Sequence, residues 1–291
     1  MRVGTRESKL AMRQTEIFCR RMEEVNPGIE CEIVGIKSLG DIDLTSPLNQ
    51  MSATGAFVRE LDDAMLRGEI DCTVNSLKDI PIDVAPGLSV AAVFPRDAVE
   101  DVILPCPLEE LPAGAKVGTS SVRRVEMLKE VRPDLDVVPL RGNIHTRLRR
   151  LDDGDFDAII LAKAGLDRMG IDRPMAVLDK YRFIPAPAQG VIAVECRSDD
   201  SATLEAVRRL DDRRTRLETG VERGIMKMMG AGCSSPVGIN AEADGDTVRV
   251  RAVSYGYSEV PRRVERELSV DYVMDELLDI AEYLTARRDS I

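Results

Sequence analysis

The chain has 291 residues, 44% of them hydrophobic and 31% charged, and its formal net charge is −11. This composition is typical of a globular protein of two or three domains, and the acidic balance argues against a general nucleic-acid binder, which needs a basic face for phosphates. No apolar stretch approaches the roughly 18 residues that cross a membrane, and the first residues lack the apolar core of a signal peptide. We therefore expect a cytoplasmic protein without a membrane partner.

The first part of the chain alternates strand-like and helix-like segments. A helix is predicted to begin after Ser8 and to end at the Asn-Pro-Gly turn of residues 26–28, and a second helix lies between Gly55 and Gly68. The predicted strands are residues 3–5, 31–37, 70–74 and 88–94. This alternation indicates an α/β domain with a mainly parallel sheet.

The same pattern restarts near residues 94–97. Strands are predicted at residues 115–117, 137–140 and 157–162, and helices at residues 122–131 and 144–151. Residues 185–190 are typical of a crossover linker, and we expect the strand at 191–195 to return to the first domain. Ligands of such folds bind beyond the carboxyl ends of the strands.

After about residue 201 the pattern changes to two helical stretches, antiparallel strands at 248–253 and 262–268, and a final amphipathic helix. The turn at 244–246 precedes the first of these strands. The predicted fold class is therefore α/β, with two periplasmic-binding-protein-like lobes and a small C-terminal α+β domain. The predicted boundaries are 1–94 with 188–207 for the first lobe, 95–187 for the second and 208–291 for the C-terminal domain.

Two loops place arginines at predicted helix starts. They have the sequences GTSSVRR at residues 118–124 and LRGNIHTRL at residues 140–148. The N–H groups of a helix start, its dipole and a guanidinium fork all favour an anion. For either loop alone, a solvated helix start with capping Ser or Thr is the alternative. Both loops together, in an acidic chain, indicate a ligand rich in carboxylate or phosphate.

Two other positions could take part in chemistry. Lys78 and Asp79 follow a predicted central strand, so Asp79 is a candidate for a lone catalytic carboxylate, although solvated turn charges are the alternative. With His145 as its only histidine, the chain offers no histidine-based metal site and no Ser-His-Asp triad, and we expect no metal.

Six cysteines are present, and none forms a C-x-x-C pair. Five of them are interpreted as small buried hydrophobic residues. Cys233 differs because it lies in a loop of small residues with Gly230 and Gly232, where a thiol is accessible for covalent attachment. A cysteine in a tight turn without a role is the alternative.

A series of motifs along nearly the whole chain resembles the porphobilinogen deaminase family, also called hydroxymethylbilane synthases. The motifs are GTRES (4–8), GAFVREL (55–61), VNSLKDIP (74–81), VGTSSVRR (117–124), LRGNIHTRL (140–148), DAIILAKAGL (157–166) and ERGIMKMMGAGC (222–233). The resemblance implies a transferase that joins four porphobilinogen units head to tail into a linear tetrapyrrole, on a covalently bound dipyrromethane cofactor. It also implies a cytoplasmic monomer that passes its product to uroporphyrinogen-III synthase.

The resemblance also assigns roles to individual residues. It implies that Cys233 carries the thioether bond to the cofactor and that Asp79 is the catalytic aspartate. The implied cofactor contacts are Asp41, Lys78, Ser121, Arg123, Arg124 and Arg147. The implied substrate contacts are Arg6, Ser8, Gln14, Arg141, Arg147 and Arg168.

The residues agree with this chemistry. Each pyrrole unit carries an acetate and a propionate, so the growing product gains two negative charges per step. Arginine side chains suit these carboxylates because a guanidinium group offers paired N–H donors. Positive charge develops on a pyrrole nitrogen as ammonia is lost, and a fixed carboxylate such as that of Asp79 would stabilise it. The chain departs from the family pattern at Thr54, Asn75, His145, Met229, Ala231 and Ser235, and none of these changes removes a charged catalytic group.

The alternative function is a cytoplasmic two-lobed binding or sensor module for a small polycarboxylate. Two lobes with anion-binding loops are also found in solute-binding proteins and in the sensor domains of regulators. That function gives no role to Cys233 or to the C-terminal domain. Ehrlich's reagent would distinguish the two, because a binding module has no pyrrole with which to react.

Overall fold

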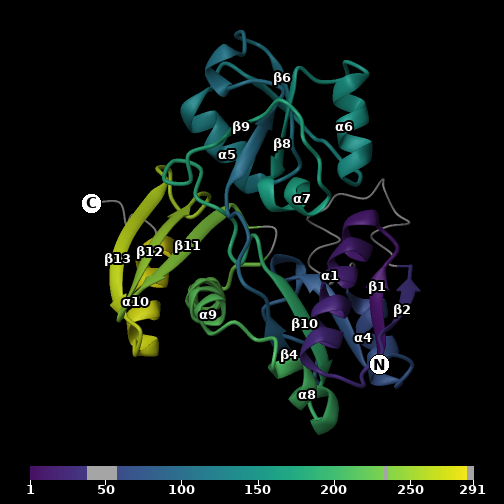
Figure 1. Cartoon of the computed structure of the whole chain (residues 1–291). Helices are drawn as coiled ribbons and strands as arrows, with labels where there is room; N and C mark the ends of the chain where they lie inside the picture. Colours follow the sequence, from purple (N-terminus) through teal and green to yellow (C-terminus); the bar gives the residue numbers. More distant parts are fainter. Residues whose placement is uncertain (38–57, 233–234, 287–291) are drawn as a thin grey trace. The chain divides into compact units, whose positions relative to one another are not determined.

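The structure is a computed structural model that describes residues 1–37, 58–232 and 235–286 (Figure 1). The chain forms two compact units. Unit 1 comprises residues 1–97 and 190–216, and unit 2 comprises residues 98–189 and 217–291. The predicted return of the chain to its first domain after the linker is thus confirmed. The division of the remainder into a second lobe and a separate C-terminal domain stays a prediction.

Unit 1 contains a five-stranded sheet in the order β2-β1-β3-β10-β4. Strand β1 pairs in parallel with both β2 and β3, whereas β10 is antiparallel to β3 and β4. Because β4 opposes β10, it runs in the same direction as the first three strands, and the predicted mainly parallel sheet is confirmed. The strands are β1 (Arg2–Arg6), β2 (Glu32–Ile36), β3 (Cys72–Ser76), β4 (Leu88–Val93) and β10 (Ile192–Arg197).

Three helices pack on this sheet: α1 (Lys9–Val25), α4 (Arg59–Leu66) and α8 (Ser201–Arg208). Helix α1 begins where predicted, because Ser8 Oγ accepts a hydrogen bond from the Ala11 N–H at 3.3 Å. Its apolar face buries Phe18 and Met22 completely. Gly4 leaves room on β1 for side chains packed above it, since a Cβ there would lie 2.3 Å from Ile70 Cδ1 and 3.3 Å from Leu61 Cδ2 on α4.

Unit 2 contains a second five-stranded sheet in the order β7-β6-β8-β5-β9. Strand β6 is parallel to β7 and β8, and β5 is antiparallel to β8 and β9. This sheet is also mainly parallel, as predicted. Its elements are β5 (Asp101–Leu104), β6 (Lys116–Gly118), α5 (Val122–Val131), β7 (Asp136–Val138), α6 (Ile144–Asp152), β8 (Ala158–Ala162), α7 (Lys163–Arg168) and β9 (Ala176–Val177).

The C-terminal part of unit 2 is an antiparallel sheet of β11 (Val237–Asp244), β12 (Thr247–Ser254) and β13 (Arg262–Ser269). Helix α10 (Met274–Thr285) packs on this sheet (Figure 1). Helix α9 (Arg213–Met228) precedes the sheet, and the buried Glu222 carboxylate on it accepts the Ala241 N–H of β11 at 2.7 Å. Within the described ranges, every helix is too short or too polar to span a membrane.

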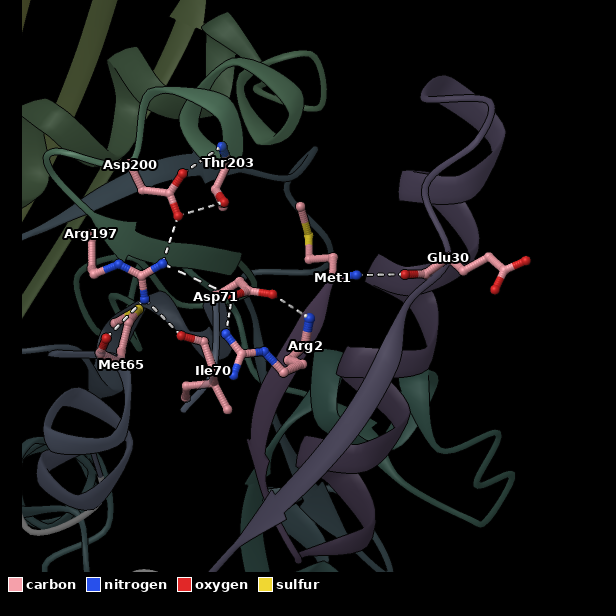
Figure 2. A network of polar contacts seen from close by, with 9 residues as sticks. All are labelled: Met1, Arg2, Glu30, Met65, Ile70, Asp71, Arg197, Asp200 and Thr203. Atoms are coloured by element: carbon pink, nitrogen blue, oxygen red, sulfur yellow. Dashed lines mark hydrogen bonds and ion pairs between the residues drawn. The ribbon is translucent and has the colours of Figure 1, made fainter. Parts of the chain in front are cut away.

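Arg197, the last residue of β10, joins several elements of unit 1 at the edge where β1 and β3 begin. Figure 2 shows its guanidinium donating to the carbonyl oxygens of Met65 (2.9 Å) and Ile70 (2.8 Å) and to the Asp200 carboxylate (2.7 Å). Asp200 in turn accepts the Thr203 N–H and so caps α8. One side chain therefore holds the end of α4, the end of β10 and the start of α8.

The Asp200 carboxylate makes this cluster sensitive to acid. The hydrogen bond from the Thr203 N–H lowers the pKa of Asp200 below its usual 3.8, and the Arg197 charge acts in the same direction. Because the folded-state pKa is depressed, the stabilisation is complete above the unfolded-state pKa and is lost as the pH falls through the folded-state value.

We expect Arg197→Gln to lower the free energy of unfolding by about 2 kcal/mol at pH 7, since two backbone carbonyls and a carboxylate lose a charged donor. Urea unfolding followed by circular dichroism measures this change. Arg209→Gln is the control, because the Arg209 side chain forms an exposed ion pair with Glu205. Equal midpoints for the two variants would contradict the assignment.

Candidate active site

In unit 1, the carboxyl ends of the parallel strands β1 and β3 lie at the same edge of the sheet, because the two strands are neighbours. Arg6 is the last residue of β1 and is half-buried. Gln14, on α1, is 2% exposed, and its Nε2 donates to Ser76 Oγ at the end of β3 over 2.9 Å. The structure therefore brings together the segments that carry Arg6, Ser8, Gln14 and Lys78.

The turn η1 (Leu77–Asp79) follows β3 directly. Its first residue is fixed because the Leu77 N–H donates to the Val191 carbonyl at 2.9 Å, and the Ile80 N–H closes the turn on the Leu77 carbonyl. This leaves Lys78 half-buried and Asp79 exposed. An exposed carboxylate on a rigid turn is available to a substrate without a large rearrangement.

Two polar groups lie beneath this edge. Thr5 Oγ1 is buried and has no hydrogen-bond partner within residues 1–37, 58–232 and 235–286. Asn75, at the position where the family frequently has histidine, is buried and donates from Nδ2 to Glu195 Oε2 on β10 at 3.2 Å. This departure thus has a structural role, since it satisfies a buried carboxylate.

In unit 2, the loops after β6 and β7 meet at the carboxyl edge of the second sheet. Ser120 Oγ donates to the Leu140 carbonyl at 2.9 Å. Gly142 has a φ of +107°, which favours glycine, and Asn143 caps α6 by accepting the Thr146 N–H at 3.0 Å. Arg141 beside them is half-buried. Ser121, the N-cap residue of α5, is also half-buried.

Other predicted residues lie on helices that follow strands of this sheet. Arg147 is half-buried on α6, and its Nε donates back to the Gly142 carbonyl at 2.7 Å. Arg168 is half-buried in the last turn of α7, which follows β8. His145 is half-buried in the first turn of α6, and none of the residues that the structure describes hydrogen-bonds its Nε2.

Arg123 and Arg124 are placed differently from the other predicted contacts. They are 3% and 6% exposed, and each donates to the buried Asp101 carboxylate, at 2.8 and 2.7 Å. Sequence reasoning missed Asp101 and also Gln189, which donates to the same carboxylate at 2.9 Å. A signal for Asp101 was present in the sequence. This aspartate directly precedes the apolar residues 102–104, with which it forms a buried strand.

Two of the predicted residues, Asp41 and Cys233, lie outside the described residues, as does the departure Thr54. Of the other departures from the family pattern, Met229 and Ala231 are buried, and Ser235 Oγ accepts the Gly232 N–H at 3.0 Å. Among the described residues, no group of three or more His, Cys, Asp or Glu side chains is arranged to hold a metal ion.

Comparisons with known proteins agree on one family. A family model described as "Porphobilinogen deaminase, dipyromethane cofactor binding domain" matches residues 1–205, which include Asp79 and the predicted arginines but not Cys233. A probable porphobilinogen deaminase of Methanocella arvoryzae is 46% identical over 253 residues, which are 86% of this chain and 82% of the relative. The porphobilinogen deaminase of Syntrophus aciditrophicus is 37% identical over 290 residues, 98% and 94% of the two chains.

Among the solved structures found in the comparison is a periplasmic substrate-binding protein of an ABC transporter from Coxiella burnetii. It is 13% identical, with a TM-score of 0.44, over 77% of this chain and 96% of that one. The family is decided by the sequence matches, which extend over most of the chain and include both basic helix starts and the turn with Asp79. The chain belongs to the porphobilinogen deaminase family.

Proposed function

We propose that the chain is a porphobilinogen deaminase, a transferase that condenses four porphobilinogen units head to tail into hydroxymethylbilane and releases ammonia. The observation that carries the proposal is the family match, because the matched residues include both basic helix starts of unit 2 and the exposed Asp79 of unit 1. The matches do not favour the binding or sensor module, since the relatives are named as the enzyme.

The residues of unit 2 fit a cofactor that carries carboxylates. Arg123 Nε and Arg124 Nε are buried N–H donors without an acceptor in the part of the chain that the structure describes, and an anionic group would supply one. In this proposal the dipyrromethane is bound through a thioether to Cys233 and held by Asp41, Lys78, Ser121, Arg123, Arg124 and Arg147. When bound, the dipyrromethane supplies the pyrrole carbon to which new units are joined.

The substrate contacts of the proposal are Arg6, Ser8, Gln14, Arg141, Arg147 and Arg168. The arginines bind the acetate and propionate groups, for which a guanidinium offers paired donors. Asp79 holds its carboxylate near the pyrrole nitrogen that becomes positively charged as ammonia leaves, and it can accept or return a proton there. The rigid turn that carries Asp79 keeps the carboxylate in place during each of the four condensations.

The finer parts of the proposal rest on the sequence patterns and on the resemblance. They are the division into two lobes and a C-terminal domain, a cytoplasmic location, a monomeric state, and transfer of the product to uroporphyrinogen-III synthase. Each of them stays a prediction.

We expect Asp79→Asn to fold normally and to turn over about 10²–10³-fold more slowly, because the fixed negative charge is lost. The rate of hydroxymethylbilane formation measures the loss, and circular dichroism checks the fold. Asp83→Asn is the control, because Asp83 is exposed four residues downstream. Near-normal turnover of Asp79→Asn would refute the catalytic role.

Intact mass spectrometry of the denatured protein should show the polypeptide plus two pyrrole units. Cys233→Ser should remove this added mass and the activity together. The other five cysteines should tolerate serine with a loss of stability at most. Cys19, Cys72 and Cys196 are buried, whereas Cys31 and Cys106, also predicted to be buried, are only half-buried. Burial disfavours the thiolates of the buried cysteines, since it raises the pKa of Cys19 to about 12 and that of Cys196 to about 11. Added mass that persists in Cys233→Ser would place the cofactor elsewhere.

Arg141→Leu and Arg168→Leu should each carry the cofactor yet stall during elongation, because incoming carboxylates lose their partners. Mass spectra taken during turnover should then show enzyme with one to three extra pyrroles accumulating. The matched control is Arg149→Leu, an exposed arginine on α6. If the distribution of these species is the same in wild type and both variants, the two arginines do not bind substrate.

A further inference from the structure

Asp101 is the shared acceptor of a buried group of donors in unit 2. It begins β5, and its side chain is fully buried. Its Oδ2 accepts Arg123 Nη2 at 2.8 Å, and its Oδ1 accepts Arg124 Nη2 at 2.7 Å and Gln189 Nε2 at 2.9 Å. A single carboxylate therefore contacts both arginines and a residue of the predicted crossover linker.

Each arginine is also held at a second point. Arg123 Nη1 donates to the Ile184 carbonyl at 2.9 Å, and Arg124 Nη1 donates to the Ile160 carbonyl on β8 at 3.1 Å. Two contacts fix the plane of a guanidinium group, because it is rigid. The Nε–H of each arginine is buried and has no acceptor among the described residues.

The charges of this group are not balanced. Two guanidinium groups share the Asp101 carboxylate, so these three directly bonded side chains together carry one net positive charge. Burial by itself would raise the pKa of Asp101, but the charges of Arg123 and Arg124 outweigh it and hold the pKa well below 3.8. Burial lowers the pKa of Arg123 in spite of Asp101. An excess buried charge is unfavourable unless an anion accompanies it.

We propose that Asp101 is a positioning residue, which holds Arg123 and Arg124 in one arrangement and leaves their excess charge and free Nε–H donors for the carboxylates of the dipyrromethane. This inference rests on the proposed function. A neutral residue at position 101 would leave both arginines without their common anchor, and they would turn toward other acceptors.

Gln189 positions Asp101 in turn. Besides Asp101, its Nε2 donates to the Val99 carbonyl at 2.7 Å. The preceding Ala188 has a φ of +60°, which is unfavourable for alanine, and its N–H donates to the buried Glu222 carboxylate at 2.6 Å. The linker is thus held in a specific conformation, and through Gln189 this conformation determines where the Asp101 carboxylate lies.

Asp101→Asn tests the role, because the amide has the size of the carboxylate but cannot serve both guanidinium groups. We expect folded protein at low temperature in which cofactor occupancy, measured by intact mass on the folded fraction, falls at least tenfold. Glu218→Gln is the control, since Glu218 is also buried in unit 2 and accepts the Ala243 N–H at 3.0 Å. Its melting temperature should fall while its occupancy stays full.

If Asp101 were only structural, Asp101→Asn would behave like Glu218→Gln, with a lower melting temperature and full occupancy, and that result would overturn the proposal. Gln189→Met provides a second test if Asp101→Asn fails to fold, because it retains every charge. We expect Gln189→Met to lower cofactor occupancy severalfold. Full occupancy in this variant would overturn the positioning role but would leave the proposed function intact. Wild-type protein without the added mass would overturn the proposed function as well.

Discussion

The insertion of β10 between β3 and β4 is the constraint on which the candidate site of unit 1 depends. Its hydrogen-bond ladder joins Ile192 to Ser76 and Cys196 to Cys72, residues more than a hundred positions apart. The same segment provides the Val191 carbonyl that accepts the Leu77 N–H and fixes the turn with Asp79. The exposed carboxylate therefore owes its position to a strand that the chain adds only after completing most of unit 2.

The two sheet edges position their polar side chains by different means. In unit 1 one such contact is the neutral hydrogen bond between Gln14 and Ser76. In unit 2 a buried carboxylate and two guanidinium groups form one charged cluster. Removing one partner of such a cluster costs more than the cluster contributes to stability, because it leaves buried charge uncompensated. This asymmetry favours a role in fixing geometry over a role in stability.

The elements with strong local signals were predicted well. Helix α5 has the predicted bounds of residues 122–131, α1 begins at its serine cap, and β12 follows the predicted turn at 244–246. Strand β5 was not predicted, because its four residues are too few to show a hydrophobic periodicity. Its pairing partners on β8 also lie almost sixty positions away in the sequence. The two-residue strand β9 was missed for the same reason. The positions of Asp41 and Cys233 lie outside the described residues, so their roles rest on the motifs.

Local patterns were sufficient to identify the α/β class, the mainly parallel sheets, the return of the chain and the family, because these depend on periodicity, capping residues and ordered motifs. They were also sufficient to select the arginines at helix starts. What those arginines contact was decided by packing: the loops predicted donors for an external anion, whereas Arg123 and Arg124 already hold Asp101. A long charged side chain pairs with whatever acceptor the fold buries beside it, and that acceptor came from a strand more than twenty residues away.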